Sequence, residues 1–376
     1  MRARDLGIVI GSGRPGPLGA ITDVPGVRVG HLTLVRGDGP LVRGLGPVRT
    51  GVTMIVPHGG DPWTEPVFAG AHRLNGNGEL TGLEWIRESG LLGGPIGLTN
   101  THSVGVVRDA LVRAEIQRRP PGSVSWALPV VGETWDGKLN DIDGFHVTTD
   151  DALAALGTAA TGPVAEGGVG GGTGMVCHEF KGGIGTSSRV VAPELGGWTL
   201  GVLVQANYGR RERLSIDGVA VGSAIPIDVV PSPARPGPPP AGSGSIIVVL
   251  ATDAPLLPHQ CERLAQRAAL GIARVGGTGA TSSGDLILAF ATGNRGLPDP
   301  APGADLRTTV DGLRMVLDPT LDALFDATIE ATEEAIVNAL VAAETMTGRD
   351  GITAFALPHE RLVDVMAAAG RLHRAP

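Results

Sequence analysis

The feature that most constrains the fold is a set of apolar runs that polar residues hardly interrupt. Strands buried on both faces have this pattern, whereas strands with one solvated face alternate apolar and polar residues. Helical periodicities lie between the runs, so we expect a layered α/β or α+β fold in which helices cover the sheets. The expected strands cover residues 51–57, 125–131, 198–206, 245–253 and 285–292.

The helical stretches carry recognisable start signals. Pro258 falls in the first turn of one of them, where a missing N–H costs no helical hydrogen bond. The longest stretch has Asp318 as its expected N-cap, with Pro319 just inside the helix. The expected helices cover residues 80–90, 104–119, 258–272 and about 319–346.

Composition excludes several classes of protein. The 376 residues are 42% hydrophobic, enough for a substantial core in one or two domains. The 59 glycines and 29 prolines predict many tight turns rather than disorder, because apolar runs lie between them. A formal net charge of −8 and 3% aromatic residues argue against nucleic acid as a partner. The N-terminus lacks a long apolar stretch, so we expect a cytoplasmic protein that crosses no membrane.

Neither the cysteines nor the nine histidines form a recognised metal or redox motif. Cys177 and Cys261 lie far apart in sequence, which leaves a structural disulfide open. His178 follows Cys177, so the two would point to opposite faces of a strand. The glycine-rich run 166–175 lacks both the P-loop ending and the dinucleotide spacing, so we expect tight turns and close packing there. We expect no metal and no cofactor.

Residues 231–244 form a Pro/Gly-rich segment directly before an expected core strand. Such a composition favours extended, solvated chain, as in a linker. The chain passes from it straight into 245–253, with Gly244 and Ser245 at the junction. From composition alone, this junction is an ordinary linker end. The Ser/Thr-rich segment 278–285 is likewise an ordinary polar loop.

Nine stretches, in order along nearly the whole chain, change that interpretation. None is specific by itself, but together they resemble the DmpA-type family, the L-aminopeptidase/D-alanyl esterase-amidases and their β-peptidyl aminopeptidase relatives. They are RARDLGI (2–8), ITDVPGVRVGH (21–31), GPVRTGVT (46–53), PIGLTNTHSVG (95–105), ETWDGKLNDI (133–142), GGGTGMVCHEFKGGIGTSSR (170–189), LVQANYG (203–209), GSIIVVLATDAPLLPHQ (244–260) and SSGDLILAF (282–290).

The resemblance implies an α+β fold, the αββα sandwich of the N-terminal-nucleophile-like type that ornithine acetyltransferases share. It also implies a precursor that cuts itself before a serine at the start of a core strand, a position that Ser245 matches. Gly242–Ser243 is a rival scission point, but the apolar run that starts directly after Ser245 favours Gly244–Ser245. The expected organisation is one domain, 1–376, cut into 1–244 and 245–376.

The resemblance further implies an assembly and a class of substrate. Family members form higher oligomers, and we expect a homo-oligomer, a tetramer of two-chain units. The implied substrates are small peptides, amides or esters with a free amino terminus, with L-, D- or β-amino acids at that end. Nucleic acid, membrane and cofactor have no part in this hypothesis.

The site residues carry over one at a time. Ser283 and Asp285 match the hydroxyl and carboxylate that support the nucleophile, although some relatives carry Glu in place of Asp285. In a strand that begins near residue 284 they share a face. Asn207 matches the side-chain donor of the oxyanion hole. Glu133 matches the carboxylate that receives the substrate's amino group. Trp135 is also expected to line the substrate site, where some members have Tyr, so a phenolic role there does not carry over.

The chemistry explains why a self-made amino terminus would be useful. A serine hydroxyl is a weak nucleophile until a base takes its proton. An N-terminal Ser245 would carry its own base, an α-amine with a pKa of about 7.7–8.0. Gly244 suits the preceding position because it tolerates strained backbone angles. Asn100 is left open, as a pocket residue or a turn residue.

Two alternatives stay beside this hypothesis. One is a related autoprocessed enzyme, an acyltransferase or an oligoamide hydrolase, in which the same residues serve another acyl acceptor or substrate. The other is an unprocessed binding or scaffold protein that keeps only the fold. An intact mass and an assay for transfer to an added amine would distinguish the three.

Overall fold

A computed structural model describes residues 1–123, 126–233, 244–299 and 307–373. Much of the Pro/Gly-rich segment 231–244 and the rival junction Gly242–Ser243 lie outside the described residues. The Gly244–Ser245 junction lies within them.

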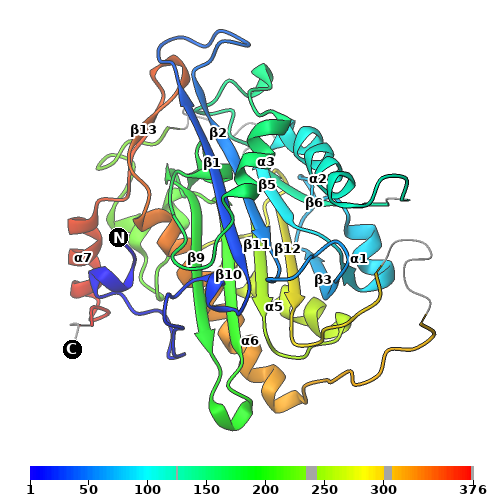
Figure 1. The fold of residues 1–376 in the computed structure, drawn as a ribbon. Helices are drawn as coiled ribbons and strands as arrows, with labels where there is room; N and C mark the ends of the chain where they lie inside the picture. The colour runs from blue at the N-terminus through cyan, green and yellow to red at the C-terminus, as the bar shows by residue number, and fades with distance from the viewer. Residues whose placement is uncertain (124–125, 234–243, 300–306, 374–376) are drawn as a thin grey trace.

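Two β-sheets lie face to face between two layers of helices (Figure 1). This arrangement confirms the expected αββα sandwich. The four-stranded sheet has the order β1 (Arg28–Arg36), β2 (Val48–Val56), β5 (Ile96–Asn100) and β6 (Val130–Thr134). The six-stranded sheet has the order β4 (Leu91–Leu92), β3 (Val67–Arg73), β12 (Gly284–Ala291), β11 (Ser245–Thr252), β10 (Thr199–Asn207) and β9 (Gly183–Val190).

Helices cover the outer face of each sheet. Against the four-stranded sheet pack α2 (Val104–Arg118) and α3 (Thr149–Gly157). Against the six-stranded sheet pack α5 (Pro258–Arg274) and α6 (Asp318–Val341), the orange helix of Figure 1. The remaining elements of these types are α1 (Leu83–Ser89), α4 (Val221–Ala224), α7 (His359–Ala368) and the short strands β7 (Val176–Cys177), β8 (Phe180–Lys181), β13 (Met346–Thr347) and β14 (Thr353–Ala354).

The layering explains the apolar runs. Every residue of β11 and of β12 is buried, because one face of each strand meets the other sheet and the opposite face meets helices. Ile247 and Val249 belong to the core between the sheets, whereas Ile246 and Val248 belong to the core beneath α5 and α6. Such burial contributes roughly 1.5–3 kcal/mol for each large apolar side chain.

One parallel pair of strands in each sheet positions the site. In the six-stranded sheet β11 runs parallel to β12, with Ser245 opposite Gly284, and antiparallel to β10, with Ser245 opposite Asn207. In the four-stranded sheet β5 runs parallel to β6, with Asn100 opposite Thr134. Both pairs bring ends of neighbouring strands to one edge of their sheet.

Two expected elements differ most from the structure in their bounds. The strand expected over 125–131 is β6, which begins only at Val130, because Pro129 has no N–H to donate to a ladder. The longest helix has Leu317 as its N-cap and Asp318 as its first residue, and it ends at Val341 rather than near residue 346. Its expected cap is therefore off by one residue.

The structure also shows the state of the two cysteines and the packing of the glycine-rich run. Cys177 and Cys261 are buried free thiols, so the disulfide that the sequence left open is not formed. We expected His178 and Cys177 to point to opposite faces of one strand, and this is wrong. Cys177 is the last residue of β7, and His178 lies in the following turn with φ of 46°. Close packing in 166–175 is confirmed, since a Cβ on Gly171 would lie 2.1 Å from Gln205 Oε1. No helix in the described part of the chain has the length and apolarity that a bilayer span requires.

Candidate active site

Ser245 is the first residue of β11 and is only 3% exposed. Its hydroxyl donates to the carbonyl oxygen of Gly244 at 2.6 Å and accepts from the backbone N–H of Gly284 at 3.1 Å. Gly244 has φ of 133°, a region that glycine enters freely and other residues rarely adopt. The hydroxyl therefore lies against the peptide bond that the sequence analysis marked for scission.

Ser283 and Asp285 lie at the start of the neighbouring strand. Ser283 Oγ donates to Asp285 Oδ1 at 2.5 Å, as their two-residue spacing predicted. Gly284, between them, is the residue that pairs with Ser245. Burial raises the pKa of the Asp285 carboxyl, and the hydrogen bonds from Ser283 and Asn75 oppose that rise. The structure thus brings together Ser245, the expected nucleophile, and its two expected supporting residues.

Asn75 is a member of this group that the sequence analysis missed. Its Oδ1 accepts from the backbone N–H of Asp285 at 2.5 Å, and its Nδ2 donates to Asp285 Oδ2 at 3.1 Å. Nδ2 also donates to the carbonyl of Ala280 at 3.0 Å. The only signal in the sequence is the Asn-Gly-Asn-Gly run 75–78, which predicts a turn but says nothing of its contact with Asp285.

Asn207 is the last residue of β10 and lies opposite Ser245. Its Oδ1 accepts from the backbone N–H of Val176 at 2.8 Å, and its Nδ2 donates to the carbonyl of Trp135 at 2.9 Å. A side-chain amide nitrogen has two hydrogens, so one N–H remains for a ligand. Trp135 thus contributes its backbone carbonyl here, while its ring packs against Gly137.

Glu133 lies near the end of β6 and is 3% exposed. Its Oε1 accepts from the backbone N–H of Glu79 at 3.0 Å, and its Oε2 accepts from the hydroxyl of Thr101. Burial raises the pKa of this carboxyl, and both hydrogen bonds lower it. Gly78 lies between Glu133 and the β11–β12 pair, because a Cβ there would lie 2.9 Å from Glu133 Oε1 and 3.1 Å from Gly284 Cα.

A second buried carboxylate, Asp136, was not expected. It accepts from Asn100 Nδ2 at 3.1 Å and from Asn140 Nδ2 at 3.0 Å. Burial raises the pKa of Asp136 to about 6. Asn100, which the sequence left open, also caps the following turn through Oδ1, which accepts from the N–H of Ser103 at 2.9 Å. It is therefore a buried residue that holds Asp136 and the turn after β5.

Taken together, these groups offer a serine hydroxyl, a Ser–Asp pair, an amide donor and a buried carboxylate on two facing sheets. Among the described residues, no group of three or more His, Cys, Asp or Glu side chains is placed to hold a metal ion. This set matches acyl transfer through a serine nucleophile.

Comparisons with known proteins identify the family of the chain. The model of peptidase family S58 matches residues 19–354. Beta-peptidyl aminopeptidase BapA of Sphingosinicella microcystinivorans is 48% identical over 382 residues, covering 100% of this chain and 94% of that protein. A beta-aminopeptidase of Burkholderia sp. superposes with a TM-score of 0.91 at 56% identity, covering 100% of both chains.

A further solved structure describes the fold class. The L-aminopeptidase D-Ala-esterase/amidase of Ochrobactrum anthropi, described as a prototype of the serine aminopeptidases with a variant of the Ntn hydrolase fold, superposes with a TM-score of 0.85. It is 46% identical, and the match covers 99% of both chains. The resemblance to the DmpA-type family is thereby confirmed. The chain is therefore a hydrolase that belongs to peptidase family S58.

Proposed function

We propose that this chain is an autoprocessed serine aminopeptidase that releases N-terminal residues, β-amino acids among them, from small peptides, amides or esters. The observation that carries the proposal is the 2.6 Å contact between Ser245 Oγ and the carbonyl oxygen of Gly244. The β-aminopeptidase relatives support the substrate class. The buried carboxylate of Glu133 supports a requirement for a free amine on the substrate.

Maturation would begin with attack of Ser245 Oγ on the carbonyl carbon of Gly244. The C–N bond breaks, the nitrogen of Ser245 receives the hydroxyl proton and becomes an amine, and Gly244 is held as an ester on Oγ. Water then hydrolyses the ester, which leaves a carboxylic acid on Gly244 and a free hydroxyl on Ser245. Scission at this point supplies the nucleophile with its own base.

In turnover the new α-amine takes the proton of Ser245 Oγ as the oxygen attacks the substrate carbonyl. The remaining N–H of Asn207 stabilises the oxyanion, a contact worth about 10²–10³ in rate at comparable sites. The leaving amine receives the proton, and water hydrolyses the acyl-enzyme. Ser283, held by Asp285, orients the groups around the nucleophile.

Glu133 would bind the ammonium group of the substrate. A carboxylate and an ammonium 4 Å apart attract by about 4 kcal/mol at an effective dielectric of 20. The two hydrogen bonds to Glu133 hold its carboxylate in place. A substrate with a blocked amine loses this attraction.

We also propose that the fragments 1–244 and 245–376 stay together as one domain. Along its length β11 is paired with β10 on one side and β12 on the other, so scission at its start leaves the ladder intact. A tetramer of two-chain units and a cytoplasmic location remain predictions.

An intact-mass spectrum of the purified protein tests the proposal most directly. We expect two masses, with the smaller fragment beginning Ser-Ile-Ile, and a single uncleaved, inactive chain for Ser245→Ala. Transfer of the acyl group to an added amine in preference to water would favour the acyltransferase. A full-length, well-folded chain with undiminished turnover would overturn autoprocessing, and one without turnover would support the binding or scaffold protein.

A further inference from the structure

A short hairpin next to the oxyanion site holds a buried lysine. Strands β7 and β8 pair Val176 with Lys181 across a two-residue turn. Both turn residues, His178 and Glu179, have positive φ, 46° and 63°, the geometry of the tight turns that suit hairpins. The hairpin therefore fixes Lys181 directly beside the peptide that contacts Asn207.

Lys181 is fully buried, and its ammonium contacts backbone carbonyls alone among the described residues. Nζ donates to Gly182 at 2.7 Å, to Met175 at 3.0 Å and to Gly172 at 3.3 Å. An ammonium has three N–H donors, so the three carbonyls match the charged form. Burial lowers the pKa of Lys181, and the three carbonyl acceptors oppose that shift because they stabilise the ammonium form.

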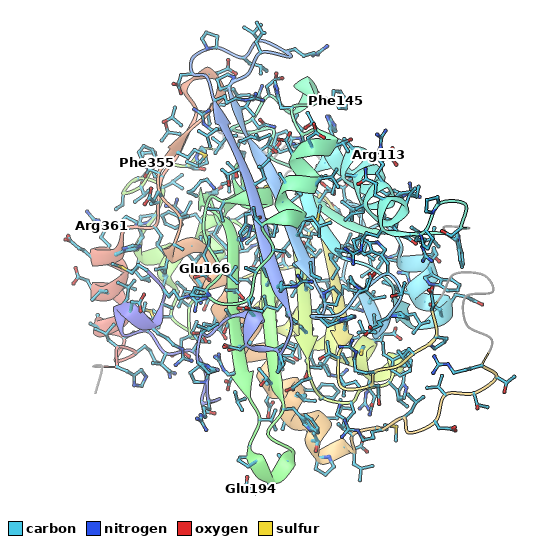
Figure 2. All side chains as sticks on the ribbon, viewed as in Figure 1. Arg113, Phe145, Glu166, Glu194, Phe355 and Arg361 are labelled. Carbon is cyan, nitrogen blue, oxygen red and sulfur yellow. The ribbon has the colours of Figure 1, made fainter. Side chains whose placement is uncertain are left out.

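This charge is costly to bury, so its placement calls for an explanation. The sequence has 30 basic residues but only two lysines, Lys138 and Lys181. A compact ammonium fits three converging carbonyls, whereas a planar guanidinium does not. The hairpin also receives support from outside, because the N–H of Lys181 donates to the carbonyl of Phe355 at 2.7 Å, a residue labelled in Figure 2.

One peptide group connects Lys181 to the oxyanion site. The carbonyl of Met175 accepts from Lys181 Nζ at 3.0 Å and from the N–H of Gly182 at 2.9 Å. The N–H of the same peptide, on Val176, donates to Asn207 Oδ1 at 2.8 Å. A cation on the carbonyl of an amide makes its N–H a stronger donor, and hydrogen bonds in a chain reinforce one another.

We propose that Lys181 is a positioning residue for the oxyanion site. Through the Met175–Val176 peptide, its charge fixes and polarises the side chain of Asn207, whose free N–H then stabilises a tetrahedral oxyanion more strongly. The proposal rests on the proposed function, because it assigns Asn207 to the oxyanion. Lys181 itself contacts neither substrate nor nucleophile.

Kinetics of Lys181→Met test the charge with little change in shape. We expect kcat to fall about 10-fold, a part of the 10²–10³ that a whole oxyanion donor supplies, and the affinity for 1-aminoethylboronic acid to fall equally. That probe forms a tetrahedral anion on Ser245 Oγ. The inhibition constant of alanine, which forms no such anion, should not change.

Arg189→Met is the matched control. Arg189 is also buried but lies near the end of β9, outside the β7–β8 hairpin, where it donates to the carbonyls of Ile10 and Ser188 and pairs with Glu330 and Glu334. We expect processed Arg189→Met to keep kcat and boronate affinity. The proposal is wrong if Lys181→Met keeps both, or if it loses alanine and boronate affinity to the same extent.

A measurement on the unsubstituted protein covers the case in which Lys181→Met fails to fold or to mature. The sequence contains two Met-Val dipeptides, Met175–Val176 and Met315–Val316. Labelling Met with ¹³C at the carbonyl and Val with ¹⁵N therefore selects two amide signals. Saturation with 1-aminoethylboronic acid should move the Val176 proton downfield and leave Val316 unchanged.

A stationary Val176 signal in boronate-inhibited enzyme would overturn the coupling. Failure of the proposed function has a different signature, namely an uncleaved chain without turnover that boronate does not bind. The two failures are thus distinguishable in the same samples.

Discussion

The two parallel strand pairs make an instructive comparison. In β11–β12 the chain enters the sheet at the site, with Ser245 and Gly284 as the first residues of their strands. In β5–β6 the chain leaves the sheet at the site, and Asn100 and Thr134 are the last residues. Strand starts meet strand ends across the space between the sheets.

Under the proposed function, this difference separates the residues of the chemical step from those that recognise the substrate. A strand start can become a chain terminus without loss of its ladder, so β11 can supply a nucleophile that carries an amine. A strand end cannot do so, and β6 carries the buried Glu133 carboxylate instead. One loop bridges the two pairs, since Asn75 contacts Asp285 and the N–H of Glu79 contacts Glu133.

The largest expected effect tests the strand-start pair. Ser283→Ala should lower kcat about 10³-fold with little change in KM, because Ser283 orients Ser245 and its amine for a proton transfer that contributes about 10²–10⁴ in rate. Steady-state kinetics of the processed enzyme measure it. Ser282→Ala, next in the chain but without the bond to Asp285, is the control and should stay near wild type. A comparable loss in both variants would assign the effect to the loop as a whole.

The next effect tests the strand-end pair. Glu133→Gln should raise KM for free-amine substrates by about 10²–10³ and leave N-acetylated analogues unaffected, because only the ion pair is removed. Glu79→Gln, which removes a nearby exposed carboxylate, should change KM little. Equal losses for free and acetylated substrates would contradict ammonium recognition by Glu133.

Asp136 sharpens the contrast through pH. Burial raises the pKa of the Asp136 carboxyl from about 3.8, its value in the unfolded chain, to about 6 in the folded protein. Between pH 3.8 and about 6, the folded state therefore binds a proton that the unfolded state has lost. Stability therefore falls as pH rises through this window, by about 2–3 kcal/mol at 1.36 kcal/mol per pKa unit. Urea unfolding of Ser245→Ala, with and without Asp136→Asn, measures this. The two pH profiles should diverge between about pH 4 and 6; parallel profiles would refute the assignment.

The smallest expected effect tests the loop that contacts both the β11–β12 pair and the β5–β6 pair. Asn75→Ala should lower kcat about 10-fold and leave KM nearly unchanged, because it frees the Asp285 carboxylate from a hydrogen bond worth about 1–2 kcal/mol. Asn77→Ala, which removes a bond from the same loop to the carbonyl of Ser282, is the control. A rise in KM without a fall in kcat would place Asn75 with recognition instead.

The sequence predicted the parts that local pattern encodes. The apolar runs of β10, β11 and β12 and the two-residue spacing of Ser283 and Asp285 depend on neighbouring residues alone. The contacts of Asn75, Asp136 and Lys181 depend on which distant segments meet, and nothing in their own surroundings announces burial. The roles carried over from the family resemblance remain proposals for mutagenesis.

The double pairing of β11 has a consequence for the mature protein's lifetime. A continuous precursor can unfold and refold as a single chain, whereas two separated fragments would have to find each other in solution. The central strand of the six-stranded sheet would then belong to the partner that had drifted away. Maturation would thus exchange reversible folding for kinetic persistence, so that the working enzyme lasts only as long as its first unfolding event is delayed.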